Sequence, residues 1–219
     1  MPGFDVIGDV HGHADALERL LHALGYRRKH GAYRHPERAA IFVGDLIDRG
    51  HQQQRVLGVV RGMCDAGSAR AVMGNHEYNA VCFATEDPGR PGEHLRPHTD
   101  KNLSQHRRFL EQMQALEAWS EAHRDWIAWF RTLPLWLELD GLRVIHACWH
   151  APSQAVLAPY LDTANRLTHD GFVATARRDT PEYEALETVL KGLTRFGWAP
   201  MEEDGRVIGL KMNKGSVTL

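Results

Sequence analysis

The sequence predicts an α/β fold in which helices cover the faces of a parallel β-sheet. Apolar runs typical of strands occupy residues 4–9, 39–44 and 69–75, and amphipathic helices are predicted between them at 14–26 and 52–67. Alternating strands and helices favour parallel strand pairing. Each of the three strands also ends in a glycine followed by Asp or Asn. Polar side chains are therefore expected to meet at the carboxyl edge of the sheet, where α/β proteins bind their ligands.

The composition is that of a globular protein with a substantial core. The chain has 219 residues, 43% hydrophobic and 25% charged, which favours a single domain over residues 1–219. A formal net charge of −2 gives no indication of a nucleic-acid or anionic-membrane partner. The three cysteines form no CxxC pair. No apolar run reaches the roughly 18 residues that a membrane-spanning helix requires. The first motif begins at Gly8, so a cleavable signal peptide of about 15 to 30 residues would remove it. We therefore expect a cytoplasmic protein.

The first two strand–helix units follow from residue spacing and helix-stop signals. The run after the first strand places Leu17, Leu20, Leu21 and Leu24 at the spacing of one helix face, and Gly25 is where that helix is expected to end. The next strand, AAIFVG, is short and apolar, as buried strands are, and QQQRVLGVVRGMCDAG follows it as a second helix. A third apolar run, ARAVMGN, completes the predicted sheet.

After the third strand the chain changes character. Residues 84–101 are rich in Pro, Gly and charge and are predicted to form a loop. Residues 102–131 form a long helical pattern that is expected to break near Ser120. We expect residues 84–131 to be a helical cap inserted in the domain.

A β-hairpin is predicted at residues 133–147. Two apolar runs flank Asp140 and Gly141, a pair that suits the two-residue turn between right-twisted strands. The second strand ends at His146, so a residue that can bind a metal again follows a predicted strand.

Three short motifs gather possible metal and phosphate ligands at the strand ends. GDVHG contains Asp9 and His11, GDLIDRG contains Asp45, Asp48 and Arg49, and GNHE contains Asn75, His76 and Glu77. Each motif alone has a simpler explanation, because Gly, Asp and Asn are common in tight turns and a single histidine is often a core residue. Their recurrence at three strand ends favours a functional site over three unrelated turns.

In this order, GDVHG, GDLIDRG, GNHE and VIHA resemble the signature of the calcineurin-like metallophosphoesterases. The resemblance is to the phosphoprotein phosphatase branch, which also contains symmetrical bis(5'-nucleosyl)-tetraphosphatases. It is dense over residues 4–77 and returns at residues 142–147. It implies a sandwich of two β-sheets flanked by helices, with a two-metal site on one edge.

The resemblance also implies which residues hold two divalent metal ions. Asp45 would bridge the ions. The first ion would also take Asp9 and His11, and the second Asn75 and His146. A pair of divalent ions suits phosphate esters, because it both generates the nucleophile and screens the anionic substrate. Mixed nitrogen and oxygen ligands suit Mn, Fe or Zn better than Mg or Ca, and we expect Mn, with Fe or Zn as alternatives.

The remaining motif residues are expected to act on the substrate. Arg49 has a planar guanidinium that matches phosphate oxygens, so we expect it to bind the phosphoryl group and stabilise developing charge. Asn75 is expected to contact the substrate as well as its ion. His76 is the expected general acid for the leaving oxygen, and Asp48 the carboxylate that orients it. Glu77 is expected to have a supporting structural role.

The predicted function is hydrolysis of a phosphate monoester or phosphoanhydride by attack of a metal-bound water or hydroxide, as in phosphoprotein phosphatases. The substrate would be a phosphorylated small molecule, a nucleotide or a phosphoprotein. A dinucleoside polyphosphate hydrolase is the alternative. Its candidate basic contacts in the cap are Arg90, Arg96, Lys101, Arg107 and Arg108. These residues are equally compatible with a solvated face.

One departure from the family pattern opens a further alternative. That pattern ends with another ligand histidine in a GH sequence near the carboxyl terminus, but no histidine follows His169 here. A water, His150 or His169 could take its place, or the chain could be a metal-binding scaffold with impaired catalysis. The histidines of residues 92–106 are expected at the surface. A thiolate at Cys148 paired with His150 is a less favoured nucleophile.

Overall fold

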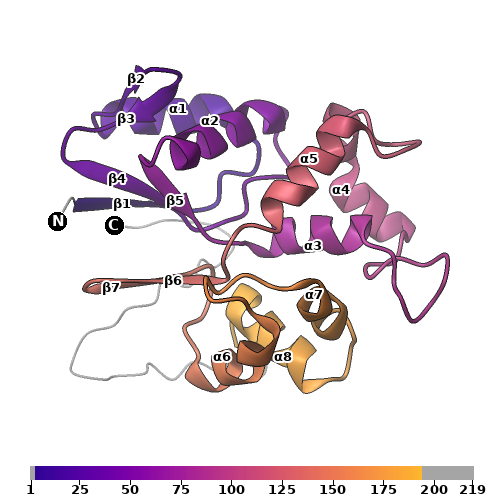
Figure 1. Cartoon of the computed structure of the whole chain (residues 1–219). Helices are drawn as coiled ribbons and strands as arrows, with labels where there is room; N and C mark the ends of the chain where they lie inside the picture. The colour runs from indigo at the N-terminus through magenta and orange to yellow at the C-terminus, as the bar shows by residue number, and fades with distance from the viewer. Residues whose placement is uncertain (1–2, 194–219) are drawn as a thin grey trace.

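The three strands predicted from the first third of the sequence form one parallel sheet. A computed structural model describes residues 3–193 of the chain. The sheet order is β1-β4-β5 (Figure 1), and the strands are β1 (Gly3–Ile7), β4 (Arg38–Phe42) and β5 (Ala69–Ala71). Ile7 pairs with Phe42, and Phe42 pairs with Ala71. The three strands therefore end level with one another, and so do the motifs that follow them.

Two helices, α1 (Ala14–Ala23) and α2 (Gln53–Asp65), cover one face of this sheet (Figure 1). Leu17 and Leu21 of α1 belong to the main hydrophobic core, at 3% and 0% exposure. Leu20 is 42% exposed, so the buried face of α1 is narrower than the leucine spacing predicts. The buried residues of α1 are Ala14, Leu17 and Leu21, which are spaced by three and four residues and so lie along one stripe of the helix.

A short hairpin between α1 and β4 is absent from the sequence prediction. Strands β2 (Arg27–Lys29) and β3 (Ala32–Arg34) pair antiparallel. They turn at His30 and Gly31, which both have positive φ, 50° and 86°. Three-residue strands rich in Arg and Lys lack the apolar alternation by which strands are recognised.

The predicted hairpin forms a separate two-stranded sheet that faces the parallel sheet. Strands β6 (Trp136–Leu139) and β7 (Leu142–Ile145) pair antiparallel. Ile41, Val72 and Val144 form a buried cluster of their own between this hairpin and the parallel sheet. The hairpin thus lies on the face opposite α1 and α2 (Figure 1). This arrangement of two β-sheets with flanking helices confirms the predicted α/β sandwich.

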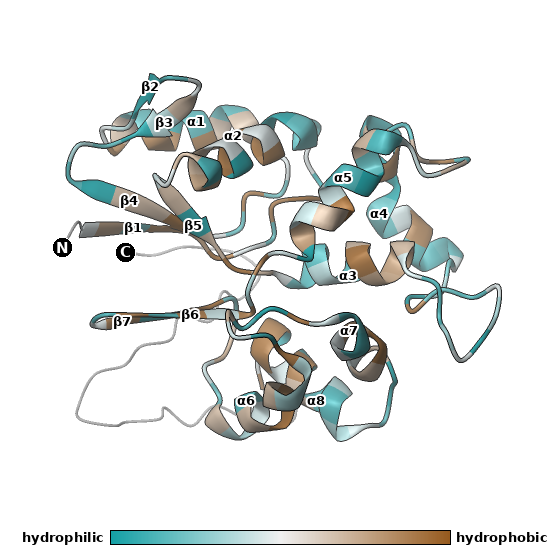
Figure 2. Ribbon diagram, viewed as in Figure 1, coloured by the Kyte–Doolittle hydropathy of each residue, from teal (hydrophilic) through white to brown (hydrophobic). Residues whose placement is uncertain are grey.

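Residues 75–84 form a helix that the sequence analysis does not predict. Helix α3 (Asn75–Ala84) begins inside the GNHE motif, and it changes from hydrophilic at its start to hydrophobic toward its end (Figure 2). Its last turns enter the core, where Val81 is 0% and Phe83 1% exposed. The run AVCFA has no polar face, so no amphipathic period marks the helix in the sequence.

The helical stretch after the loop consists of two helices, α4 (Asp100–Gln112) and α5 (Glu121–Phe130), which we call the cap helices. The predicted break is confirmed: the Ser120 hydroxyl accepts the backbone N–H of His123 at 3.0 Å and so caps α5. Figure 1 shows the cap helices on one side of α3.

The last third of the described chain is helical and lies on the other side of α3 (Figure 1). Its elements are α6 (Ala151–Leu157), the short 3-10 helix η1 (Ala158–Tyr160), α7 (His169–Thr175) and α8 (Pro181–Lys191). Helix α6 packs along α8. Among residues 3–193, none of the helices is long and apolar enough to span a membrane.

Candidate metal centre

The loops after β1 and β4 are joined by backbone hydrogen bonds. The N–H groups of Val10 and His11 both donate to the carbonyl of Asp45, at 3.0 and 2.9 Å. The N–H of Gly12 donates to the carbonyl of Leu46 at 2.8 Å. The GDVHG and GDLIDRG motifs therefore form one connected surface at the carboxyl end of the sheet.

The second and third motifs touch through their glycines. Gly44 has a φ of 94°, and a Cβ atom there would lie 2.3 Å from the backbone nitrogen of Gly74. A Cβ atom on Gly74 would lie 2.3 Å from the backbone nitrogen of Asp45. No side chain fits at such separations, so only glycine lets the two loops approach this closely. The contact brings Asp45 beside the start of α3.

Glu77 fastens the same junction from α3. Its carboxylate, which is fully buried, accepts the N–H groups of Asp45 and Leu46 at 2.8 Å each and that of Gly74 at 3.1 Å. Three backbone donors compensate the carboxylate for the water it loses on burial. Glu77 thus orients the Asp45 loop, as the supporting role predicted for it requires.

Four motif residues have left-handed backbone conformations. They are His11, Asp45, Asp48 and Arg49, with φ of 46°, 53°, 65° and 68°. Asp and His tolerate this region, whereas it is uncommon for Arg, and such residues cost on the order of 1 kcal/mol each. Strain of this kind is concentrated at functional sites. The consecutive residues Asp48 and Arg49 both line one cavity, which is described below.

His11 faces two carboxylates with a ring nitrogen that carries no proton. Its Nδ1 lies 2.8 Å from the carbonyl oxygen of Ile47, which can only accept, so the neutral ring carries its proton on Nδ1 and a lone pair on Nε2. Among the described residues, buried Nε2 has no hydrogen-bond partner. It lies 3.7 Å from carboxylate oxygens of both Asp9 and Asp45. Three acceptors therefore converge with no donor between them.

His146 forms a second group of this kind on the other side of Asp45. Its Nδ1 lies 2.5 Å from the carbonyl oxygen of Val43, which again places the lone pair on Nε2. That Nε2 lies 3.2 Å from Oδ1 of Asn75 and 3.7 Å from Oδ1 of Asp45. The Asp45 carboxylate thus faces His11 with Oδ2 and His146 with Oδ1.

Both groups suit divalent cations. Converging acceptors repel one another, and a cation between them turns that repulsion into coordination. A histidine whose other nitrogen donates to a backbone carbonyl is the usual form of a metal ligand. Within the described part of the chain, two sets of carboxylate and imidazole groups are close enough to share an ion, and they are His11–Asp45–His76 and Asp9–Asp45–His146. Asp45 belongs to both sets. The first set includes His76, and the second groups Asp9 with His146, although the resemblance assigns Asp9 to the ion held by His11.

Asp48 lies between two histidines. Its Oδ2 is 2.6 Å from Nδ1 of His76, and its Oδ1 is 3.1 Å from Nδ1 of His106. Burial alone would raise the pKa of Asp48, but hydrogen bonds and charge from the two histidines outweigh it and lower the pKa to about 2. Burial lowers the pKa of His76, yet the bond to Asp48 and the charges of Asp45, Asp48 and Glu77 leave this pKa above its usual value.

His106 is a site residue that sequence reasoning missed. The expectation that the histidines of residues 92–106 lie at the surface is wrong for His106, which is 5% exposed. Its ring packs against Phe83 and Phe109, with centroids 5.4 and 4.9 Å away. A signal was available: His106 stands three residues before Phe109 and so lies on the apolar face of α4.

Arg49 opens onto a cavity of about 630 Å³, which we call the basic chamber. Asp48, Asn75 and His76 line it from the motif loops. Basic residues line it from other segments, and these are Arg96, Lys101, Arg108, Arg178 and Lys191. The chamber is therefore continuous with the motif residues and extends from them to helix α4 and to Arg178 and Lys191.

The basic residues considered in the cap separate into two sets. Arg96, Lys101 and Arg108 line the chamber. Arg90 and Arg107 are outside its lining and pair with carboxylates: Arg90 with Asp87 and Glu93, and Arg107 with Glu111. Arg178, between α7 and α8, and Lys191, the last residue of α8, were not among the sequence candidates.

His150 and His169, which were considered as substitutes for the missing ligand histidine, do not belong to either donor set in residues 3–193. His150 has its Nδ1 2.8 Å from the Ser153 hydroxyl and caps α6, and His169 is exposed at the start of α7. Burial raises the pKa of the Cys148 thiol, which disfavours a thiolate there. The sequence after residue 193, where the family pattern has its histidine, lies outside the described residues.

The motif loops, the two sheets and the donor sets agree with the class of protein that the motifs resemble. Residues 3–209 match the calcineurin-like phosphoesterase family, and the chain belongs to that family of metal-dependent hydrolases of phosphate esters. The resemblance stated from the sequence is thereby confirmed.

Individual relatives match shorter parts of the chain. It is 49% identical over 74 residues to the asymmetrical bis(5'-nucleosyl)-tetraphosphatase PrpE of Halalkalibacterium halodurans, and 42% identical over 74 residues to that of Bacillus subtilis. Each match covers 33% of this chain and 30% of the relative, so the chain spans less than a third of these relatives' length.

Two solved phosphatase structures align over more of the chain at lower identity. A protein serine/threonine phosphatase from Saccharomyces cerevisiae, with similarity to human phosphatase PP5, covers 83% of this chain and 47% of its own at 18% identity and a TM-score of 0.48. A cold-active protein-tyrosine phosphatase of a psychrophile, Shewanella sp., covers 74% and 46% at 20% identity and a TM-score of 0.47.

Proposed function

We propose that the protein hydrolyses a phosphate monoester or phosphoanhydride at a site that holds two divalent ions. The observation that carries the proposal is the position of Asp45, whose two carboxylate oxygens face two separate donor groups. Asp9 and His11 would hold one ion with Asp45, and Asn75 and His146 would hold the other with it. Ions bound there would supply an activated water as nucleophile and would screen the charge of the phosphate.

The chain's own residues divide the remaining tasks. Arg49 lines the cavity beside the donor groups and would bind two phosphate oxygens through its guanidinium, stabilising charge as it develops. Asn75 lines the same cavity and would add an amide contact to the substrate. His76 would donate its proton to the leaving oxygen, because its protonated form is favoured by the short contact between its Nδ1 and Asp48.

Two other possibilities remain testable alternatives. A dinucleoside polyphosphate hydrolase is favoured by the tetraphosphatases among the relatives. A metal-binding scaffold with impaired catalysis would follow if nothing replaces the ligand histidine that the sequence lacks after His169. The two alternatives differ from the main proposal in which compounds are turned over.

A substrate panel with added Mn tests the proposal. We expect hydrolysis of p-nitrophenyl phosphate that stops when a chelator removes the metal and returns when Mn is resupplied. Diadenosine tetraphosphate and a phosphoserine peptide are assayed in parallel. Turnover of diadenosine tetraphosphate alone would indicate the dinucleoside alternative, and turnover of none of the three would indicate the scaffold.

A further inference from the structure

We propose that the basic chamber is a binding subsite for a second phosphate group, carried by the substrate next to the phosphate that reacts. This inference rests on the proposed function, because it names the substrate class as compact phosphoanhydrides. It starts from a charge imbalance. Among residues 3–193, six Lys or Arg side chains line the chamber, and Asp48 is the single carboxylate in its lining. Both oxygens of Asp48 already face histidines.

Five of the six chamber cations are not neutralised by a carboxylate among the described residues. Lys191 pairs with Glu187, but in the described part of the chain the other five form no ion pair with a carboxylate. Arg96 shows how this is done: its guanidinium donates to side-chain oxygens of Asn79 at 2.6 Å and Gln105 at 2.9 Å, which are uncharged. Arg108 similarly donates to the backbone carbonyl of Arg49. Their positive charge remains available to an anion.

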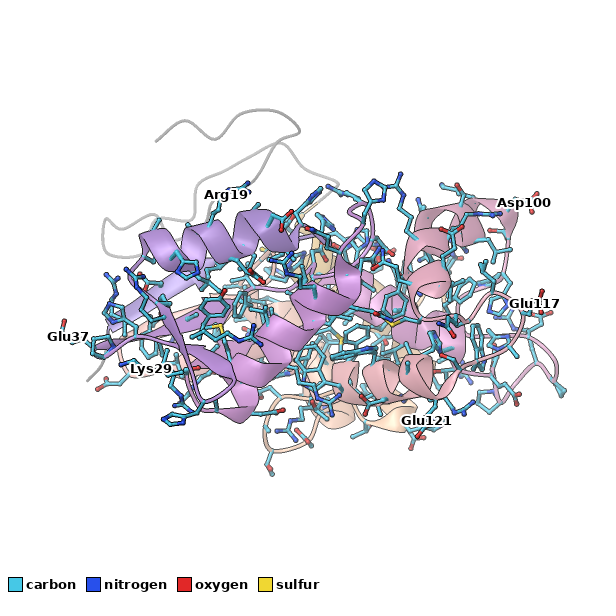
Figure 3. The ribbon with its side chains drawn as sticks, turned by 90° about the horizontal axis from the view of Figure 1, so that it is seen from above. Arg19, Lys29, Glu37, Asp100, Glu117 and Glu121 are labelled. Atoms are coloured by element: carbon cyan, nitrogen blue, oxygen red, sulfur yellow. The ribbon has the colours of Figure 1, made fainter. Side chains whose placement is uncertain are left out.

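The excess of positive charge is confined to the chamber and is not a property of residues 84–131 as a whole. Arg90 and Arg107, outside the chamber, are paired with carboxylates. Figure 3 shows Asp100, Glu117 and Glu121 projecting from the outer edge of the cap. Acidic residues are thus present on the cap helices, but they do not line the chamber.

The size and continuity of the chamber indicate the kind of ligand. A volume of about 630 Å³ is that of a small-molecule site, and its wall includes Arg49 and His76 at the reacting end. One phosphate would be served by the two ions and Arg49, which leaves four further unneutralised cations for additional negative charge. A phosphoanhydride chain places a second phosphate directly beside the first. An acidic phosphopeptide would carry its extra charges farther away, along an extended groove.

Calorimetry on the Mn-loaded protein tests the subsite without depending on turnover. The probes are methylenediphosphonate, which carries two linked phosphoryl-like groups, and methylphosphonate, which carries one; both are titrated at the same free Mn concentration. We expect methylenediphosphonate to bind at least about tenfold more tightly. Lys101→Gln and Arg178→Gln should each weaken methylenediphosphonate about tenfold and methylphosphonate far less, since one charged contact contributes roughly this factor.

Arg90→Gln and Arg107→Gln are the matched controls, because they remove the same charge from the cap outside the chamber, and they should leave both affinities unchanged. Equal affinity of the wild-type protein for the two probes would overturn the subsite. The subsite would also be overturned if Lys101→Gln and Arg178→Gln lost affinity for an acidic phosphopeptide but kept their affinity for methylenediphosphonate. Failure of the proposed function is separate: it appears as no hydrolysis of any ester, whatever the probes show.

A second and independent observation concerns His106. We infer that it is a positioning residue, which orients the Asp48 carboxylate and through it the proton donor His76. The Nδ1 of His106 faces Oδ1 of Asp48 while His76 faces Oδ2, so each carboxylate oxygen has one imidazole partner. Among the described residues, buried Nε2 of His106 has no partner. Among the described residues, the contact with Asp48 is therefore the one polar contact of the His106 ring. This contact connects cap helix α4 to the GDLIDRG loop.

Leaving-group dependence distinguishes this role from a purely structural one. His106→Leu should lower kcat for phenyl phosphate, a poor leaving group, by about tenfold, a part of the 10²- to 10⁴-fold that a general acid contributes. It should lower kcat for p-nitrophenyl phosphate far less, with KM little changed. His106→Asn should restore activity on phenyl phosphate, because its amide nitrogen can donate from the position of Nδ1.

Equal losses of kcat on the two esters in His106→Leu would overturn the role of His106, as would a failure of His106→Asn to rescue. Melting temperature and metal content are measured on both variants. A loss of kcat that is accompanied by a lower melting temperature or a lower metal content indicates a folding defect. A wild-type protein inactive on both esters would instead contradict the proposed function.

Discussion

Replacing Asp45 by Asn is expected to remove bound metal and activity together. The two oxygens of Asp45 face His11 and His146 separately, so loss of its charge weakens both donor groups at once. Metal ions contribute several kcal/mol to such reactions, and each 1.4 kcal/mol is a factor of ten, so activity should fall by roughly 10³-fold or more. The measurements are metal content by plasma emission spectrometry and hydrolysis of p-nitrophenyl phosphate.

Asp65→Asn is the matched control. Asp65 ends α2, its side chain is 70% exposed, and its contact with Arg61 is a long surface pair, so its substitution should leave metal content and rate unchanged. An Asp45→Asn protein that retained two ions per chain would show that Asp45 does not bridge them. The proposed assignment of ligands would then be wrong.

His76→Asn is expected to keep the metal and to lose turnover. The ring of His76 is fixed by a 2.6 Å contact with Asp48, and general acids typically contribute about 10² to 10⁴-fold. We expect a loss in that range for phenyl phosphate, measured as kcat. The loss should be smaller for p-nitrophenyl phosphate, whose leaving group needs less protonation.

The geometry makes metal content the deciding measurement for His76. Its Nε2 lies 3.8 Å from Oδ2 of Asp45, close enough to join a donor set with His11. If His76→Asn emptied the site of metal, His76 would be a ligand and the division of roles would need to be redrawn. His169→Asn, at an exposed position on α7, is the control for nonspecific effects of losing a histidine.

Much of the site follows from local sequence rules. Strand propensity, helix spacing and glycine position locate β1, β4 and β5 and place Asp9, Asp45 and Asn75 after them. Parallel strands that end level bring such residues to one edge, so their proximity is implied by the topology. The break at Ser120 and the hairpin before His146 are likewise determined locally, by a helix cap and a two-residue turn.

Contacts between distant segments were decided only by the tertiary structure. No pattern near His106 shows that its ring meets Asp48, because that contact depends on how α4 packs over the motif loops. The convergence of Arg178 with Lys101 in one chamber depends in the same way on packing on both sides of α3. Sequence periodicity reports which face of an element is buried, but it carries no information about which other element covers that face. The sequence itself therefore determines that the motif residues lie together at the strand ends. Tertiary packing determines which residues orient Asp48 and which supply positive charge to the chamber.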